Sequence, residues 1–326
     1  MVKKKLAIMA AGVAVLALAL AGCSGKASSS STADAANASI KICIYTHGDG
    51  GTFWSVVQKG AEDAAKQLGV TLDYQGSSND SAKQASTISA GVKGGCSAIG
   101  ASAPDPGAIK DAMLAAKAAN LPTLTLNSGS DVYKDLGAFT HVGQDETVAG
   151  EQAGLKFNDL GLKKILCPIQ EAANSGLTDR CNGAAKTFKG TVQQFNVDGA
   201  LADLTGAEAK IQAALQADPT IDGVFALNAD VATGAVLPAV QAVNPKIVVG
   251  TVDLSNDALK AISAGTLAFA IDQQQYAQGF LAVQLLYLAV KDAIEVGGGN
   301  PVYTGPAFVT KDNVQAVQAS VQAGTR

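Results

Sequence analysis

Several kinds of functional group are scarce in this chain of 326 residues, which contains two histidines and one tryptophan. Two histidines without a Ser-His-Asp constellation argue against nucleophilic hydrolysis, and no cysteine spacing resembles a zinc site. Beyond the first five residues there is no basic run, and acidic residues outnumber basic ones by 28 to 24, which argues against a nucleic-acid partner. We therefore expect no catalytic residues, no metal and no cofactor. Apolar residues (48%) suffice for a sizeable globular core.

The first 39 residues are predicted not to belong to the fold. Lys3, Lys4 and Lys5 precede an apolar run that ends in Ala21, Gly22 and Cys23, the pattern of a signal peptide. Specifically, it resembles a bacterial lipoprotein signal, cleaved after residue 22 and lipidated on Cys23; the alternatives are a transmembrane anchor or an ordinary secretory signal. Residues 23–39 would form the lipidated, flexible tether. The mature chain would carry 21 basic and 28 acidic residues, a net charge of about −7.

Four cysteines remain after Cys23, an even number in an exported chain. Cys43 lies in the first expected strand and Cys96 begins the third, and these two strands are neighbours in a doubly wound sheet, so a bridge between them is reasonable. Cys167 and Cys181 share one strand-turn-helix unit and form the second expected pair. The alternative is four buried free thiols.

Residues 42–69 are the stretch around which the chain is organised. An apolar strand leads through THGDGGTFW into a helix with Val57, Ala61 and Ala64 on one face, and a strand over residues 70–74 completes a βαβ unit. The turn lies at the carboxyl end of a parallel strand, where such folds bind ligands. We expect it to expose Phe53 and Trp54 as an aromatic platform.

The same pattern continues and then begins again at Lys163. In the second half we expect a helix over residues 181–188, a capping box of Thr205 and Glu208, and a last strand over residues 302–309. Asp145 and Glu146 would open a helix, mainly as caps. The prediction is an α/β fold of two doubly wound parallel-sheet lobes. The first lobe takes residues 40–144 and 274–305, the second residues 145–273 and 306–326, joined by a multi-strand hinge.

A resemblance covers nearly the whole mature chain. It is carried, in order, by the FW pair, PDPGAIKDA, LPTLTLNSG, HVGQDETVAG, NSGLTDRCNG, VFALNAD, VVGTVDLS and FAIDQQQYAQG. In order and spacing, these segments resemble the type I periplasmic binding protein family, in particular ribose-binding-like proteins that deliver sugars to ABC transporters.

This resemblance implies a site in which aromatic rings stack on a sugar while amides, acids and an arginine bond its hydroxyls. The implied ligand-binding residues are Phe53, Trp54, Ser102, Asn127, Gln144, Arg180, Asn228, Asp253 and Gln273, with His47, Asp49 and Asp272 as further candidates. Gly50–Thr52 and Asn127–Ser128 replace the Asn-Asn-Pro and Asp-Arg of the ribose binder. Ribose is therefore not the expected sugar.

Each of these roles has a structural alternative. Trp54 is alternatively a core residue, Asn228 and Asp253 helix caps, and Arg180 a surface or interlobe ion-pair residue. His47 is as well explained by a solvated loop position, and His141 is expected to be structural.

The implied function is that of a monomeric, lipid-anchored extracytoplasmic protein that binds a small neutral sugar or polyol and delivers it to the permease subunits of an ABC importer. A ligand sensor for a membrane receptor is the alternative on the same fold. An extracytoplasmic hydrolase is a distant one.

The Cys23 anchor predicts processing that globomycin blocks and partition of the mature protein into detergent. Replacing Cys23 by alanine should abolish both. A Cys23→Ala protein that loses its signal yet stays equally membrane-bound would contradict the anchor.

Overall fold

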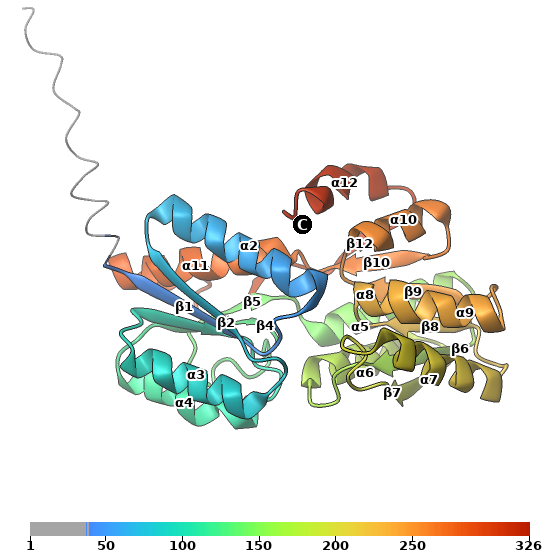
Figure 1. The fold of residues 1–326 in the computed structure, drawn as a ribbon, viewed down its shortest axis with the longest axis horizontal. Coiled ribbons are helices and arrows are strands. Elements are labelled where there is room, and N and C mark those ends of the chain that lie inside the picture. The colour runs from blue at the N-terminus through green and yellow to red at the C-terminus, as the bar shows by residue number, and fades with distance from the viewer. Residues whose placement is uncertain (1–36, 38) are drawn as a thin grey trace, which may run out of the picture.

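The computed structural model describes residue 37 and residues 39–326, which form two α/β lobes set side by side (Figure 1). The predicted signal peptide, Cys23 and nearly all of the predicted tether lie outside these residues. Among the described residues, no helix is both long and apolar enough to cross a membrane.

The first lobe is built on a six-stranded parallel sheet. Its strands, in spatial order, are β11 (Val302–Tyr303), β5 (His141–Gly143), β4 (Thr123–Asn127), β3 (Ala98–Ala101), β1 (Lys41–Thr46) and β2 (Thr71–Gly76). The side chains of successive β1 residues point to opposite faces of the sheet, as the two-residue period of a strand requires. Ile42 and Ile44 pack in the core shared with helices α2 (Gly51–Leu68) and α11 (Gln275–Asp292). Tyr45 packs in the core shared with α3 (Ser81–Lys93) and α4 (Pro106–Ala118).

The second lobe repeats this arrangement, as predicted from the sequence. Its sheet, in the equivalent order, contains β12 (Ala307–Val309), β10 (Phe269–Asp272), β9 (Val248–Val252), β8 (Gly223–Ala226), β6 (Lys164–Ile169) and β7 (Thr191–Asn196). Only the edge strand β12 is antiparallel to its neighbour. Helices α5 (Glu146–Asp159) and α6 (Ser175–Thr187) share one core with the sheet. The other core includes α7 (Leu204–Ala217), α8 (Ala229–Val231), the π-helix η1 (Ala232–Val236), α9 (Leu237–Val243), α10 (Asn256–Ala264) and α12 (Val314–Gln322).

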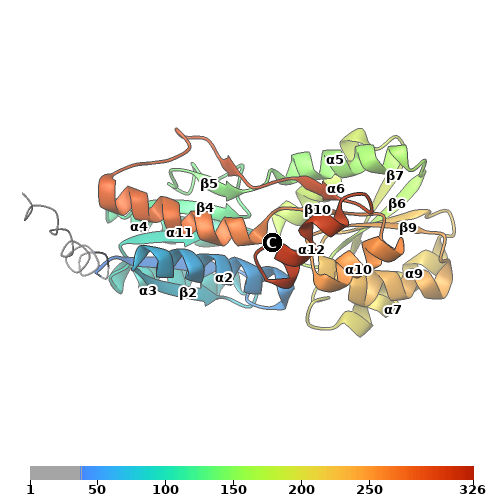
Figure 2. The same cartoon turned by 90° about the horizontal axis from the view of Figure 1, so that it is seen from above.

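Glycines let one pair of helices in each lobe approach closely. Seen from above, α2 and α11 lie side by side (Figure 2). A Cβ at Gly279 would lie 1.9 Å from the Val57 carbonyl oxygen, and one at Gly60 would lie 2.1 Å from that of Tyr276. Helices α5 and α6 approach in the same way through Gly150 and Gly183. These positions exclude any side chain larger than hydrogen without a shift of the backbone.

The chain crosses between the sheets three times, and the crossings are bonded to one another. They follow β5, β10 and β11. In the third, the Thr304 amide donates to the Gly143 carbonyl oxygen and the Thr304 hydroxyl donates to the Gln273 carbonyl oxygen, both at 2.7 Å. One threonine thus ties the other two crossings together. The lobe boundaries themselves stay a prediction.

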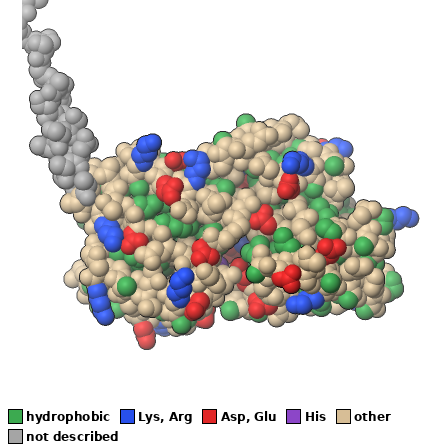
Figure 3. Space-filling model, in the orientation of Figure 1, with side chains coloured by type: hydrophobic (Ala, Val, Ile, Leu, Met, Phe, Trp, Pro, Cys, Tyr) green, Lys and Arg blue, Asp and Glu red, His purple; other side chains and the backbone are tan. Residues whose placement is uncertain are grey.

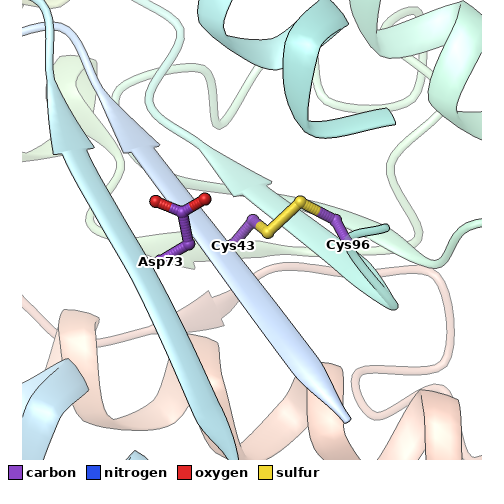
Figure 4. Close-up of side chains that lie close together, drawn as sticks. All are labelled: Cys43, Asp73 and Cys96. Atoms are coloured by element: carbon purple, nitrogen blue, oxygen red, sulfur yellow. A yellow bond between two sulfur atoms is a disulfide. The ribbon is translucent and has the colours of Figure 1, made fainter. Parts of the chain in front are cut away.

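Both cysteine pairs are joined as disulfides, with Cα–Cα distances of 5.9 Å for Cys43–Cys96 and 6.1 Å for Cys167–Cys181. Asp73 lies beside the first disulfide (Figure 4). Among the described residues, this is the one group of three potential metal ligands that lie close enough to share an ion. Because the disulfide uses both sulfur atoms, the group offers no thiolate for a metal.

Several sequence predictions of local structure are wrong. Helix α6 begins at Ser175, six residues before the expected start, because Asn174 caps it. Asp203, not the Thr205–Glu208 box, caps α7. The expected strand over residues 302–309 is two short strands in different sheets, separated by the third crossing.

Candidate functional site

The carboxyl ends of the two sheets face each other, and side chains from both lobes enclose a cavity of about 40 Å³. Its lining is His47, Gly50, Phe53, Trp54, Asn127, Ser128, Gln170, Glu171, Asn174, Leu177, Arg180, Leu201, Leu227, Asn228, Asp253 and Gln273. A second cavity of about 260 Å³ shares Gly50, Trp54 and Glu171 with it and includes Asp49. The first cavity has room for only a few water molecules. As it stands, the first cavity is smaller than a sugar.

Arg180 is the only Lys or Arg side chain of this lining, and it is 4% exposed. Its Nε and Nη2 donate to the two carboxylate oxygens of Glu146 at 2.6 and 3.0 Å, and its Nη1 donates to the Leu227 carbonyl oxygen at 3.0 Å. Burial alone would lower the pKa of Arg180, but Glu146 raises it. The guanidinium is thus charged and held by a bidentate pair, so its charge is already neutralised within the protein.

The backbone packing of α5 and α6 brings this pair together. Glu146 is in the first turn of α5, and Arg180 lies within α6. A Cβ at Gly150 would come within 2.1 Å of the Arg180 carbonyl oxygen, so the two helices touch one turn away from the pair. Glu146, expected as a cap, is instead a buried ion-pair partner; Asp145 is the N-cap.

Asp253 is the centre of a polar chain that runs from one lobe to the other. It accepts from Gln273 Nε2 at 2.6 Å and from Asn228 Nδ2 at 3.3 Å, and Asn127 Nδ2 of the first lobe donates to Gln273 Oε1 at 3.3 Å. Its contacts are thus uncharged amides. Burial raises the pKa of the Asp253 carboxyl to about 7, although nearby Arg180 acts to lower it.

Asn127 and Asp253 occupy equivalent positions in the two lobes, just at the ends of β4 and β9. Both have a positive φ, 62° for Asn127 and 73° for Asp253. Asn and Asp tolerate this left-handed conformation better than most residues. Asn127 and Asp253 therefore both fit the left-handed backbone at these strand ends and supply polar side chains to the cavity.

His47 is buried and fixed, so its predicted alternative as a solvated loop residue is wrong. Its Nδ1 lies 2.8 Å from the Ser102 hydroxyl, and its Nε2 lies 3.6 Å from Glu171 and 3.5 Å from Asn174 Nδ2 of the second lobe. Burial would raise the pKa of Glu171, but hydrogen bonding and charge from His47 outweigh it and lower that pKa to about 2. The pair joins the two walls of the cleft.

Phe53 and Trp54 line the cavity. The prediction that a turn exposes them is wrong. Both lie in the first turn of α2 and are at least 93% buried. Trp54 meets the rings of His47 and Phe53 edge to face, each at a centroid distance of 4.9 Å. Its indole covers the backbone of Gly48, where a Cβ would lie 2.1 Å from Nε1. Trp54 therefore belongs both to the core and to the wall of the site.

Four of the predicted residues lie outside the cavity lining. Ser102 bonds His47, and Gln144 donates to Glu146 at 2.8 Å, so each supports a residue at or behind the wall. Asp49 borders the second cavity and accepts from Ser78. Asp272 is buried and accepts from Arg326 Nε and the Gln274 amide.

Sequence reasoning missed Gln170, Glu171 and Asn174 of the second lobe. Gln170 and Glu171 directly follow β6, and Asn174 caps the next helix. Polar residues at the carboxyl end of a strand, the position that Asn127 and Asp253 also occupy, are the signal that could have found them. The apolar residues Leu177, Leu201 and Leu227 carry no comparable signal in the sequence.

The charges outside the cleft form no basic patch on the face shown in Figure 3. Lys and Arg side chains stand apart there, mixed with Asp and Glu. His141 is fully buried near Thr125, and burial lowers its pKa to about 3, as befits a neutral structural residue.

Residues 40–293 match the family model described as a periplasmic binding protein domain. The chain is 28% identical over 317 residues to the xylitol-binding protein of Mycolicibacterium smegmatis, covering 94% of this chain and 86% of that protein. It is 28% identical over 234 residues to the ribose import binding protein of Bacillus subtilis, covering 71% and 75%. A carbohydrate transporter structure from Acidothermus cellulolyticus, in complex with myo-inositol, is similar with a TM-score of 0.85 and 39% identity, over 88% of this chain and 99% of that one.

Breaking the buried Glu146–Arg180 pair should destabilise the fold far more than breaking the more exposed Glu151–Lys186 pair, which joins the same two helices. Glu146→Ala leaves Arg180 buried without its partner, a change that costs about 3 to 5 kcal/mol of unfolding free energy. Glu151 of α5 pairs with exposed Lys186 at 3.4 Å, and Glu151→Ala should cost at most about 1 kcal/mol. Urea unfolding followed by circular dichroism measures both. Equal losses of unfolding free energy in the two variants would show that the buried pair stabilises the fold no more than the exposed one.

Asp253 should make stability fall as the pH rises. Because its folded pKa is raised from 3.8 to about 7, the folded state holds a proton between these values that the unfolded chain releases. Its contribution is therefore complete below pH 4 and lost as the pH rises through 7.

Asp253→Asn removes this dependence, so the variant should gain stability over the parent from pH 5 to 8, by at most about 1.4 kcal/mol per pH unit. Urea unfolding at several pH values measures the difference. Asp257→Asn, at an exposed position paired with Lys260, is the control. A difference between Asp253→Asn and the parent that is the same at every pH would refute the titration.

Proposed function

Since this chain belongs to the periplasmic binding protein family, we propose that it captures a small neutral sugar or polyol between its lobes and delivers it to an ABC importer. The observation that carries the proposal is the charge arrangement of the cleft. Its single guanidinium is engaged by Glu146, and the carboxylates of Asp253 and Glu171 also line the cavity. An anionic ligand would find no free cation there, and its burial without one would be costly.

The remaining polar groups suit a ligand with many hydroxyls. Amide groups of Asn127, Asn228 and Gln273 supply both donors and acceptors, and Asp253 accepts two hydrogen bonds in the absence of any contacting cation. Once Asp253 is ionised, vicinal hydroxyls can replace such amide contacts with charge-assisted hydrogen bonds to its carboxylate. The rings of Phe53 and Trp54 provide the apolar wall for C–H groups.

Among neutral polyols, a cyclitol or a linear pentitol is the first choice. The similar structure from Acidothermus cellulolyticus is in complex with myo-inositol, and a relative across 94% of the chain is a xylitol-binding protein. The departures at Gly50–Thr52 and Asn127–Ser128 also argue against ribose. We therefore place myo-inositol and xylitol ahead of the pentose sugars.

The family membership implies an extracytoplasmic location. We further propose that the mature protein is a monomer anchored through lipid on Cys23, that its permease partner lies in the same membrane, and that binding proceeds without catalysis. The basic residues at positions 3–5, the apolar run that follows them and the small residues just before Cys23 support the anchor. The firm bonding of Glu146 and Glu171 to other side chains supports binding over acid-base catalysis.

The only tryptophan of the chain provides the test. Titration of the protein with myo-inositol or xylitol should change the fluorescence of Trp54 saturably, because the ligand alters the surroundings of its indole. Amino acids should leave it unchanged. Trp54→Phe should retain more affinity than Trp54→Ala, which is expected to lose about 1 to 3 kcal/mol of binding free energy.

The family offers many neutral ligands, so the panel should also contain ribose, xylose, arabinose, glucose and galactose. If no member of the panel changes the fluorescence or raises the melting temperature, the proposed ligand class is wrong. If binding occurs but both Trp54 variants match the parent, the ligand lies away from this wall.

A further inference from the structure

Helix α2 begins at the cleft without a cap from its own lobe. Its N-cap residue is Gly50, which has no side chain to accept from the first-turn amides. The first turn also contains no acidic residue. Free amides at a helix N-terminus need an acceptor, and an anion there is stabilised by the helix dipole. The sequence of α2 itself therefore leaves this end unsatisfied.

The acceptor comes from the opposite lobe. Asp230 of α8 accepts from the Thr52 amide through Oδ2 at 2.8 Å and from the Thr52 hydroxyl through Oδ1 at 2.9 Å. These are the geometry and partners of a helix N-cap, except that the capping residue lies 178 positions away in the sequence. Asp230 does not serve as the cap of its own helix, because Asn228 performs that role in α8.

Glycine permits the close approach. Gly51 has a φ of 79°, and a Cβ there would lie 3.0 Å from Asp230 Oδ2. Any other residue would adopt this φ with strain and crowd the carboxylate. Gly51 at the edge of the first lobe thus leaves room for the Asp230 carboxylate of the second lobe.

We propose that Asp230 is a cap supplied across the cleft, so that closing the lobes and completing the N-terminus of α2 are one event, and that this contact sets ligand affinity without touching the ligand. Neither Thr52 nor Asp230 lines the cavity that holds Asp253 and Arg180. The effect on affinity rests on the proposed ligand capture, whereas the capping itself does not.

Closure energy adds to binding energy because only the closed form surrounds the ligand. When the lobes separate, water replaces the partners of Asp230 and Thr52, so the net gain is that of charge-assisted hydrogen bonds over hydration. We expect Asp230→Ala to raise the Kd for myo-inositol, or for whichever panel ligand binds, by about 5- to 30-fold. Most of the change should appear in the dissociation rate, because the contact must break before the ligand can leave.

The matched control is Asp203→Ala. Asp203 lies in the same lobe as Asp230 and caps α7, accepting from the Gly206 amide at 2.8 Å. Its loss removes a cap of the ordinary kind within one lobe. It should lower the melting temperature while leaving the dissociation rate within about twofold of the parent.

Two further variants separate the contact from general damage. Thr52→Val removes the hydroxyl but keeps the amide donor, so it should have part of the effect, and Thr52→Ser should restore parental affinity. In the Thr52→Val/Asp230→Ala double variant, the two losses should not add, because both remove the same contact. Additive losses, or an unchanged dissociation rate in Asp230→Ala, would overturn the link to affinity.

A measurement without ligand tests the cap alone. Hydrogen–deuterium exchange should show faster exchange in the first turn of α2 in Asp230→Ala than in the parent or in Asp203→Ala. If that exchange is unchanged, the cap across the cleft is refuted. If it is faster but no panel ligand binds any variant, the cap stands and the proposed function fails.

Discussion

The buried ion pair of Arg180 and Glu146 is the interaction on which the site depends. A guanidinium that is 4% exposed needs a partner, and the close contact of α5 and α6 at Gly150 puts Glu146 within reach of both Nε and Nη2. The pair leaves the cleft with hydrogen-bonding capacity but no free positive charge. Under the proposed function, the site would select a ligand by its hydroxyls and disfavour anions.

The crossings between the lobes and the candidate site share residues, so ligand binding there would be coupled to lobe closure. Gln273 belongs to the second crossing, its backbone accepts from Thr304 of the third, and its side chain joins Asp253 to Asn127. At the rim, Asp230 bonds Thr52 of the first lobe. Polar contacts therefore connect the lobes both behind and in front of the cavity, and a ligand between them would bond to groups already aligned by closure.

The sequence predicted the repeat of the two lobes because buried parallel strands and glycine-ended helices leave strong local patterns. The resemblance to the family also implied Asn127, Asn228, Asp253 and Gln273, and all four line the cavity at or just after the ends of strands. Sequence reasoning failed where a local pattern has two physical explanations. An acid at a helix start suits a cap as well as an ion pair, and the partner of Glu146 lies 34 residues away. Likewise, nothing local distinguishes an exposed Trp54 from one buried against His47.

The most direct measurement compares myo-inositol with myo-inositol 1-phosphate by isothermal titration calorimetry. If the guanidinium of Arg180 is fully engaged by Glu146, the neutral polyol should bind and the phosphate should bind at least about 100-fold more weakly. Tighter binding of the phosphate would mean that Arg180 is free to hold an anion. That result would contradict the account of the cleft as a site for neutral polyols.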